Sequence, residues 1–433
     1  MLGWRLPESS PMILFAFLQR LFAIASVAVF AVAAWLLWRW YDADHLAGTL
    51  GYAEPSSAGL WWGAGLMVFG LFGRFPMLML LGHGKSTALA RRADSVNIPG
   101  ADGAVLHVEM EGAATGPILV FTHGWGLSAR IWAEARADLG SRFGLVFWDL
   151  PGLGRSGRPT AGYSIEGFAE DLHAVIDSLP GDRPVILVGH SIGGMTVQTF
   201  CARHPELLNR RVAAIVLENT THTNPLETMV FSRVFRPLQP MIELASRLDM
   251  VLSPALWVMN WQAYLSGSTH LAARLAGFGT RPTREQLERT ARLPTKNSPA
   301  VQARGNVAMM HWSVTDRLPR IDVPALVFVG GRDLITRDHA GETIASALPQ
   351  GRLVRVDDAG HMGPVEKAAF YNEQIGDFAE FVRLLRSRAP ASAPSRRSFL
   401  SPDADLAPPA RLDDEPVDRD RPGVGARPAA RPI

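Results

Sequence analysis

A serine set between two glycines is the feature of this chain that most directly indicates chemistry. The stretch PVILVGHSIGGM, residues 184–195, places Ser191 between Gly189 and Gly193. A serine hydroxyl is a poor nucleophile unless a base takes its proton and the backbone holds it where a substrate carbonyl can approach. Apolar residues precede the first glycine and a helical pattern follows the second. The stretch therefore predicts a tight strand-to-helix turn, in which side chains at the glycine positions would collide with the turn or its neighbours.

The same turn supplies backbone N–H groups for the oxyanion that forms when a serine attacks a carbonyl. The new helix begins at the serine, so its first amide groups and its dipole favour a developing negative charge. We expect one donor to be the N–H of Ile192. A second predicted strand ends in VFTHGWG, residues 120–126, where the N–H of Trp125 would face the same oxyanion. We expect a structural role for His123 in this stretch.

A carboxylate and a base should follow the serine in the chain, each in a loop just beyond a strand. The predicted strand at 325–329 runs into GGRDLIT, which places Asp333 past its end. The predicted strand at 353–356 runs into DDAGHMGPVEK, which does the same for His361. The carboxylate would fix the tautomer of His361 and stabilise the imidazolium that forms when the ring takes the Ser191 proton. The sequence therefore predicts a catalytic triad.

Other acids and histidines compete for these roles. Glu218 ends the predicted strand at 213–217 and is an alternative acid, whereas Asp149 precedes the serine and is expected to brace a glycine-rich loop. Asp357 and Asp358 are interpreted as turn residues. The histidines without a strand-end context are interpreted as surface or lid residues: His204, His222, His311 and His339. No His, Cys or carboxylate cluster has metal-ligand spacing, so no metal or cofactor is expected.

Five motifs together resemble the α/β-hydrolase superfamily: THGWG, DLPGLGRSGRP, GHSIGGM, GGRDLIT and AGHM. The resemblance covers residues 94–386 and implies an α/β-hydrolase fold. It also implies, motif by motif, the roles of a triad and of an oxyanion hole formed by backbone amides: Ser191, Asp333 and His361, with Trp125 and Ile192. A serine at the turn argues against the similar epoxide hydrolases and haloalkane dehalogenases, which use aspartate there. It does not argue against cofactor-free haloperoxidase-like members, which share this triad.

The elements that must position these residues alternate along the chain. Short runs rich in apolar and β-branched residues, bounded by Gly, Pro or Asp, predict fully buried strands. They lie at 105–110, 118–122, 144–148, 185–188, 213–217, 325–329 and 353–356. Helical patterns fall between most of them, at 164–179, 195–204, 340–348 and 365–385. Alternating strands and helices predict an α/β fold with a mostly parallel sheet covered on both faces, whose chemistry lies beyond the carboxyl ends of the strands.

A long segment at 219–320 separates two of the predicted strands. It exceeds a connecting loop, so we expect a helical cap inserted over the site. Its first part is rich in large apolar residues: Met229, Phe231, Phe235, Met241, Met250, Leu252, Leu256, Trp257, Met259 and Trp261. Flexible methionines and aromatic residues suit an adaptable apolar pocket. The alternative is that these residues merely pack on the core.

The first ninety residues carry a membrane signal. The uncharged run LFAIASVAVFAVAAWLLW at 21–38 is as long as a bilayer-spanning helix and ends in aromatic residues, so we expect a span over about 21–41. A second run at 60–82 contains Arg74 and Pro76, which are costly at membrane depth. The segment 1–90 is therefore expected to be an anchor of one or two transmembrane helices. A buried core helix and a cleaved signal peptide are the alternatives for the first run.

The charges that flank the two runs predict the orientation of the chain. The loop at 42–57 carries acidic residues and no Lys or Arg, whereas basic residues flank the outer ends: Arg5, Arg20, Lys85, Arg91 and Arg92. By the positive-inside rule, a helical hairpin in the inner or plasma membrane would leave the catalytic domain in the cytoplasm. If the second run only lies in the interface, the catalytic domain would be on the other side.

Composition excludes several other classes. The 43 basic and 41 acidic residues give a net charge of +2 without a long basic block, so no nucleic-acid partner is expected. The single cysteine, Cys201, excludes an intrachain disulfide framework and fits a reducing compartment. Residues 389–433 are rich in proline and alternating charge, which predicts a disordered tail.

The sequence thus predicts a membrane-anchored serine hydrolase that cleaves carboxylic esters with apolar or lipid-derived acyl groups. Its expected partners are a small-molecule ester and the membrane. Two other functions stay open. The triad could pass its acyl group to an alcohol, amine or peroxide instead of water, as in an acyltransferase or perhydrolase. The fold could also serve as a non-catalytic membrane scaffold.

Overall fold

The computed structural model describes residues 12–84, 94–229 and 232–388. The expected disordered tail at 389–433 lies outside these ranges, as do Phe231 of the predicted pocket and four of the flanking basic residues: Arg5, Lys85, Arg91 and Arg92. The described elements belong to one unit of the chain, which ends at Arg388.

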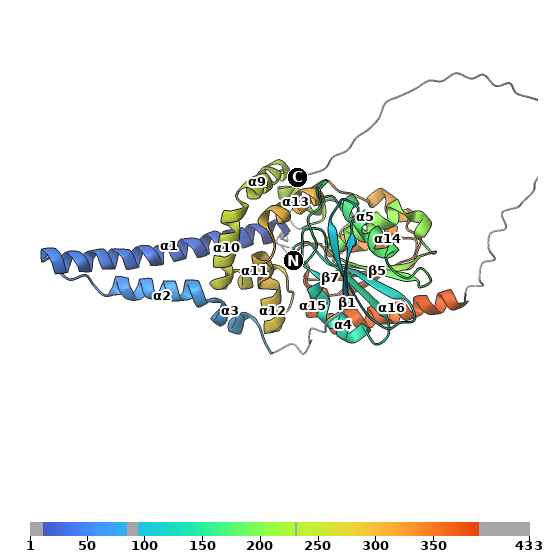
Figure 1. Cartoon of the computed structure of the whole chain (residues 1–433), viewed down its shortest axis with the longest axis horizontal. Coiled ribbons are helices and arrows are strands. Elements are labelled where there is room, and N and C mark those ends of the chain that lie inside the picture. The colour runs from blue at the N-terminus through green and yellow to red at the C-terminus, as the bar shows by residue number, and fades with distance from the viewer. Residues whose placement is uncertain (1–11, 85–93, 230–231, 389–433) are drawn as a thin grey trace, which may run out of the picture. The chain divides into compact units, whose positions relative to one another are not determined.

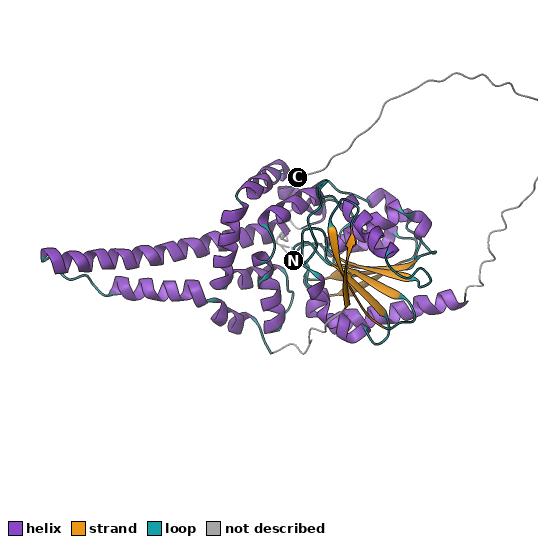
Figure 2. Cartoon of the chain, in the orientation of Figure 1, coloured by secondary structure: helices purple, strands orange, loops and turns teal. Residues whose placement is uncertain are grey.

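The described strands form one eight-stranded sheet in the order β1-β2-β4-β3-β5-β6-β7-β8, drawn in orange in Figure 2. The strands are β1 (Asp94–Pro99), β2 (Val105–Gly112), β3 (Ile118–Thr122), β4 (Gly144–Trp148), β5 (Val185–His190), β6 (Val212–Glu218), β7 (Ala325–Gly330) and β8 (Gly351–Val356). The pairs β1–β2 and β2–β4 are antiparallel, and all other neighbouring pairs are parallel. The predicted mostly parallel sheet is confirmed.

The strand predictions fail most clearly at the two edges of the sheet, although β2 is also only partly buried. β1 was not predicted, because half of the residues in its sequence DSVNIP are polar and its side chains are mostly exposed. β8 was predicted to be fully buried, but most of its side chains are exposed or half-buried because it has a neighbour on one side only. Apolar runs identify the interior strands, whereas an edge strand needs no such run.

Helices cover both faces of the sheet (Figure 1). One apolar cluster joins strand side chains to α5 (Ile165–Asp177), α6 (Ile192–Arg203) and α14 (Asp338–Ala347). The other joins them to α4 (Ala133–Leu139) and α16 (Ala368–Arg388). Neighbouring residues of a strand alternate between the clusters, as Val120 and Phe121 of β3 do. Each large apolar side chain that is fully buried contributes roughly 1.5–3 kcal/mol.

The predicted helices are present, but two of them differ at their ends. α6 begins at Ile192, directly after the serine, and not at 195, because Gly193 and Gly194 are poor helix formers that hid its first turn from sequence patterns. The helix predicted at 365–385 is divided into α15 (Gly363–Glu366) and α16. Both differences lie in segments that follow a site loop.

A helical cap is present between β6 and β7, as expected. Its helices are α7 (Pro225–Thr228), α8 (Ser232–Phe235), α9 (Gln239–Val251), α10 (Ser253–Leu265), α11 (Ser268–Ala276), α12 (Arg284–Ala291) and α13 (Pro299–Met310). Three of them pack against the N-terminal helices, namely α10, α11 and α12, and α9 contacts α1 through the Arg20–Asp249 ion pair.

The N-terminal helices form a hairpin (Figure 1). Its helices are α1 (Met12–Leu50), α2 (Ala58–Phe72) and α3 (Arg74–Leu81), and α2 packs along α1. The expected loop at 42–57 is partly wrong, because α1 continues through its acidic residues to Leu50. Residues Gln19–Leu50 are long and apolar enough to cross a membrane, and α2 with α3 passes the same test as a span bent by 64°. Only 17% of the most apolar part of α1 is buried, which argues against a core helix.

Candidate active site

Ser191 lies at a sharp turn between β5 and α6. Its backbone has φ +55° and ψ −121°, in a region that non-glycine residues rarely adopt. A Cβ atom on Gly193 would lie 2.1 Å from the Thr122 carbonyl oxygen, and one on Gly189 would lie 2.5 Å from the Gly193 carbonyl oxygen. The glycine spacing in the sequence therefore has the steric cause that was expected of it.

The structure brings Ser191, His361 and Asp333 together from three strand ends. The His361 Nε2 atom is 3.1 Å from Ser191 Oγ, and its Nδ1 atom is 3.1 Å from Asp333 Oδ2. Asp333 follows β7, and His361 follows β8. All three side chains are buried. A carboxylate can only accept, so Nδ1 carries the ring proton and Nε2 is left to accept from the serine hydroxyl.

A set of donors surrounds the Asp333 carboxylate. Oδ1 accepts from the backbone N–H groups of Ile335 and Thr336, at 2.7 and 2.9 Å. Oδ2 accepts from the Thr336 hydroxyl at 2.8 Å and from the Asn219 amide at 2.9 Å. Burial raises the pKa of Asp333, but His361 and these hydrogen bonds outweigh it and hold the pKa below its ordinary value. The carboxylate is therefore ionised and fixed in orientation.

Sequence reasoning missed two residues that hold the triad in place. Asn219, at φ +48°, also donates to the Gly360 carbonyl at 3.2 Å and accepts from the Tyr371 hydroxyl at 2.9 Å. The His190 Nε2 atom is 2.9 Å from the His361 carbonyl oxygen. Burial and the nearby His361 lower the pKa of His190 to about 3, so its ring is neutral and Nε2–H donates. The only sequence signal that could have identified His190 is its position directly before Ser191. No sequence signal marks Asn219.

The two expected oxyanion donors lie beside the serine. Ile192 is the first residue of α6, and Trp125 lines the same cavity as Ser191. Among the described residues, neither backbone N–H has a hydrogen-bond acceptor. The Trp125 indole donates to the Gln302 carbonyl at 3.0 Å, which ties this loop to α13. Both amides are thus available to a ligand.

The competing residues have other roles. Asp149 accepts from the backbone N–H groups of Ala129 and Arg155, at 2.7 and 2.9 Å, and so braces its loop. The His123 Nε2 atom accepts from the N–H of Leu150 at 3.0 Å, which is a structural role. Glu218 is fully buried, its carboxyl oxygens have no hydrogen-bond partner among the described residues, and burial raises its pKa to about 8. A neutral Glu218 cannot stabilise an imidazolium as Asp333 can.

A cavity of about 210 Å³ opens over the serine. Its lining comes from the catalytic loops, the cap and the first helix. Part of the lining is apolar: Leu127, Leu293, Pro294, Pro299, Ile335 and Met362. Another part is polar: Gln19, Arg20, Asp249, Asn260, Asn297, Gln302 and Asn306. A ligand in this cavity would meet both kinds of surface.

The described apolar cap residues that were predicted to form the pocket do not line this cavity. Met229 instead packs with Leu226 and Met310 in a small separate cluster. Met241 and Trp257 are exposed on the outside of the cap. The prediction was wrong because methionine and aromatic content does not determine which way a helix turns its apolar face.

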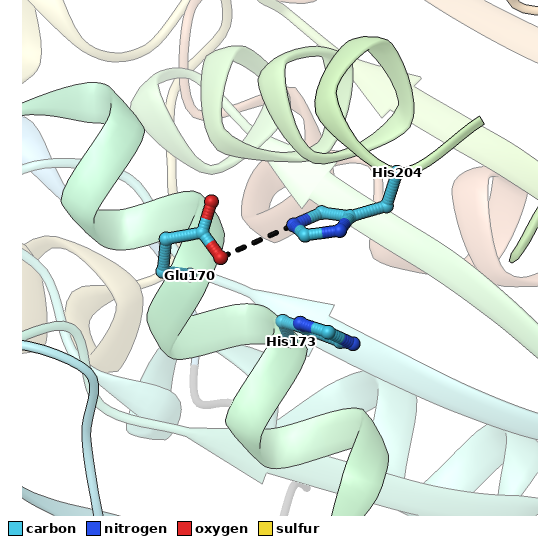
Figure 3. Close-up of side chains that lie close together, drawn as sticks. All are labelled: Glu170, His173 and His204. Carbon is cyan, nitrogen blue, oxygen red and sulfur yellow. Dashed lines mark hydrogen bonds and ion pairs between the residues drawn. The ribbon is translucent and has the colours of Figure 1, made fainter. Parts of the chain in front are cut away.

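A histidine and glutamate cluster lies at the other end of α6 from the serine (Figure 3). One ligand atom from each of Glu170, His173 and His204 lies within 4.8 Å of the others, although no metal-ligand spacing was seen in the sequence. His204 is 31 positions from its nearest cluster partner, so the fold alone joins them. The Glu170 carboxylate already accepts from Arg203 at 2.6 Å and pairs with His204 at 3.2 Å. These residue types can ligate zinc, but the cluster does not contact the catalytic residues.

Comparison with known proteins identifies a family of hydrolases. A family model described as alpha/beta hydrolase fold matches residues 117–368. The putative carbamate hydrolase RutD of Pseudomonas savastanoi pv. phaseolicola is 26% identical over 266 residues, which are 61% of this chain and 94% of that protein.

Solved structures show the same fold. A thermophilic esterase from Thermogutta terrifontis has a TM-score of 0.54 at 23% identity and covers 67% of this chain and 100% of its own. A membrane phospholipase A has a TM-score of 0.51 at 20% identity and covers 76% of this chain and 95% of its own. At these identities the likeness extends to the fold alone.

Proposed function

Because the chain belongs to the alpha/beta hydrolase fold family and is a hydrolase, we propose that it is a membrane-anchored serine hydrolase that cleaves carboxylic esters. The observation that carries this proposal is the His361 ring, which lies 3.1 Å from both the Ser191 hydroxyl and the Asp333 carboxylate. Such an arrangement is the one that nucleophilic acyl transfer needs.

In the proposed first step, Ser191 Oγ forms a bond to the ester carbonyl carbon while its proton passes to His361 Nε2. The negative charge moves to the carbonyl oxygen, which accepts hydrogen bonds from the N–H groups of Trp125 and Ile192. Collapse of this intermediate breaks the bond to the alcohol oxygen, and the imidazolium returns its proton to that oxygen. Water then attacks the acyl-enzyme by the same route, and the acid is released with the serine restored.

The cavity supports an amphiphilic ester as the substrate. Residues such as Leu293 and Met362 would contact an apolar portion, and amides such as Asn260 and Asn306 would bond a polar portion. A lipid-derived ester has both portions.

Two contacts support α1 as a permanent anchor and not a cleaved signal peptide. The Arg20 guanidinium lies 2.6 Å from the Asp249 carboxylate of α9, and the Ser26 hydroxyl donates to Ser266 at 2.7 Å. Gln19 and Arg20 also line the catalytic cavity. Cleavage after this helix would remove part of the site.

The proposed topology is a hairpin of α1 with α2 and α3, which leaves the catalytic part on the same side as the N-terminus. The acidic residues at the far end of the hairpin and the predicted basic flanks favour the cytoplasm for that side. Reporter fusions before residue 12 and after residue 90 test this proposal. A cytoplasmic signal from both is expected, and a signal from opposite sides would contradict it.

Hydrolysis of acyl esters by the full-length protein in detergent tests the chemistry. A panel of p-nitrophenyl esters of rising chain length should be cleaved, and Ser191→Ala should lower kcat by roughly 10⁴ to 10⁶-fold. Ser346→Ala, at an exposed position of α14, is the matched control and should leave kcat unchanged. Equal activity of Ser191→Ala and the native protein would refute the proposal.

A further inference from the structure

The apolar band of α1, from Leu21 to Tyr41, indicates where the surface of a bilayer would lie relative to the cap. Arg20 precedes the band and Asp42 follows it, with no charged residue but Arg39 between them. The band from Leu21 to Tyr41 is about 30 Å long at a rise of 1.5 Å per residue, which is the thickness of the hydrocarbon core. If α1 spans the membrane, Arg20 therefore lies at the boundary between hydrocarbon and headgroups.

Part of the cap lies beside this band and not outside it. The Ser26 hydroxyl donates to Ser266 at 2.7 Å, and the Gln262 side chain donates to the Gly70 carbonyl at 3.1 Å. Ser26 is about 9 Å along α1 from Arg20. The end of α10 is thus level with the outer part of the hydrocarbon core, at a depth where interfacial helices insert. Figure 1 shows α10 crossing α1 at the base of the hairpin.

The cap carries an apolar surface at this level. We define the outer face of the cap by six exposed side chains of α9 and α10: Met241, Leu244, Leu248, Val251, Trp257 and Val258. The four α9 members are spaced by three or four residues, which places them on one side of the helix. Val251 is 77% exposed and Met241 is 67% exposed. An apolar face of this extent marks an interaction surface.

Basic residues accompany the outer face. Arg233 of α8, Arg236 in the link after α8 and Arg247 of α9 are exposed. A helix with an apolar side and arginines is typical of binding to the surface of a bilayer that contains anionic lipid. The part of α1 that follows Arg20 also exposes apolar side chains, which include Leu21 and Ile24. Both observations favour a lipid bilayer over a protein partner.

The catalytic cavity reaches the same level. Ser191 is 6% exposed, whereas the Arg20 and Asp249 side chains, which also line the cavity, are 30% and 35% exposed. The cavity therefore opens near this ion pair, at the boundary set by α1. Asp249 belongs to α9, the helix that carries most of the outer face.

We propose that the outer face of the cap is immersed in the bilayer, so that the cavity opens at headgroup level and takes its ester substrate directly from the membrane. This inference rests on the proposed function, because it assumes that α1 spans the membrane. It adds the docking surface, its lipid partner and the route by which substrate reaches Ser191.

Site-specific fluorescence measures the immersion. Val251→Cys on the outer face, Val32→Cys on α1 and Leu353→Cys on β8 are labelled with an environment-sensitive dye in the full chain. The chain is reconstituted in vesicles of phosphatidylcholine and phosphatidylglycerol. The native Cys201 is buried and burial raises its pKa to about 12, so it should not react. Lipids with a nitroxide near the headgroup should quench the dye at 251, and lipids with a mid-chain nitroxide should quench it at 32. Neither should quench it at 353.

Each other outcome identifies the step that fails. Quenching at 32 but not at 251 would overturn the immersed cap and leave the anchor intact. Quenching at neither position would overturn the anchor, and the inference with it. Dye self-quenching at 251 without lipid quenching would show that a second copy of the chain covers the face, which would also overturn the inference.

Activity provides a second readout. The double variant Leu248→Asp with Val251→Asp should lower the rate on a long-chain ester dispersed in vesicles about tenfold, because apolar contact with the bilayer is lost. Its rate on a short, water-soluble ester should not change, since neither residue lines the cavity. Leu353→Asp is the matched control for an exposed leucine and should affect neither rate. An equal loss on both esters, or no loss on either, would contradict the proposal.

Discussion

The loops beyond the strands and the outer part of the cap use their residues in opposite ways. In the loops, polar side chains are buried and bonded, as Asp333 is to Thr336, Asn219 and His361. In the cap, large apolar side chains such as Val251 and Met241 are exposed. The loop geometry is fixed by the chain itself, through strand ends and glycine turns. The described chain leaves these outer side chains of the cap exposed.

Asp333→Asn is the single substitution that we expect to test this contrast with the largest effect, a loss of kcat. Asp333→Asn keeps the shape of the side chain but presents an amide where His361 Nδ1–H needs an acceptor of negative charge. We expect kcat for a soluble ester to fall by about 10⁴-fold. Asp357→Asn, at a largely exposed carboxylate in the loop after β8, is the control and should stay near the native value. A loss below tenfold at Asp333 would mean that its bonds do not serve catalysis.

Glu218, the last residue of β6, is a buried acid whose carboxyl oxygens have no hydrogen-bond partner among the described residues, in contrast to Asp333. We therefore expect its titration to change the stability of the folded state. The pKa of its carboxyl is raised by burial from 4.5 to about 8, so the folded state keeps a proton that the unfolded state loses. The stabilisation that the folded state gains from holding this proton is complete below pH 4.5. As the pH rises from 4.5 toward 8, the free energy of unfolding falls by about 1.4 kcal/mol per pH unit.

Glu218→Gln removes this titration. The free energy of unfolding of the variant, measured by thermal unfolding in detergent, should exceed that of the native protein by a margin that grows from pH 5 to pH 8. A margin that stays constant with pH would show that Glu218 is not a buried titrating acid.

A pair of methionines sharpens the contrast within the cap. Met309 of α13 is 2% exposed and Met241 of α9 is 67% exposed. Met309→Ala should lower the free energy of unfolding by about 2–5 kcal/mol, because it leaves a cavity in the core. Met241→Ala should change it by less than about 0.5 kcal/mol in detergent. Equal losses, measured by chemical denaturation, would show that α9 packs on the protein after all.

The site was more predictable than the surfaces around it. The turn at Ser191 has a steric cause that glycine spacing reveals, and Asp333 and His361 each follow a strand in the expected chain order. His190 and Asn219 were missed, because their bonds to the loops that carry His361 and Asp333 form only when distant strand ends meet. No local pattern records such a contact.

The cap pocket and the ends of the N-terminal helices were predicted less well. Methionines and aromatic residues can face a pocket, the core or a bilayer, and only the packing of α9 and α10 distinguishes these cases. The acidic residues after Tyr41 suggested a loop, whereas α1 carries them within a helix as far as Leu50. A helix interior tolerates charge wherever it is exposed to water, so charge alone does not mark the end of a helix.

The central claim is that Ser191 is a nucleophile activated by His361, and covalent trapping tests it most directly. The full-length protein is treated with a fluorophosphonate, digested, and analysed by mass spectrometry. The account predicts one adduct, on the peptide that contains Ser191, which is absent in Ser191→Ala and forms far more slowly in His361→Ala. An adduct that persists in Ser191→Ala, or a native protein that forms none, would contradict it.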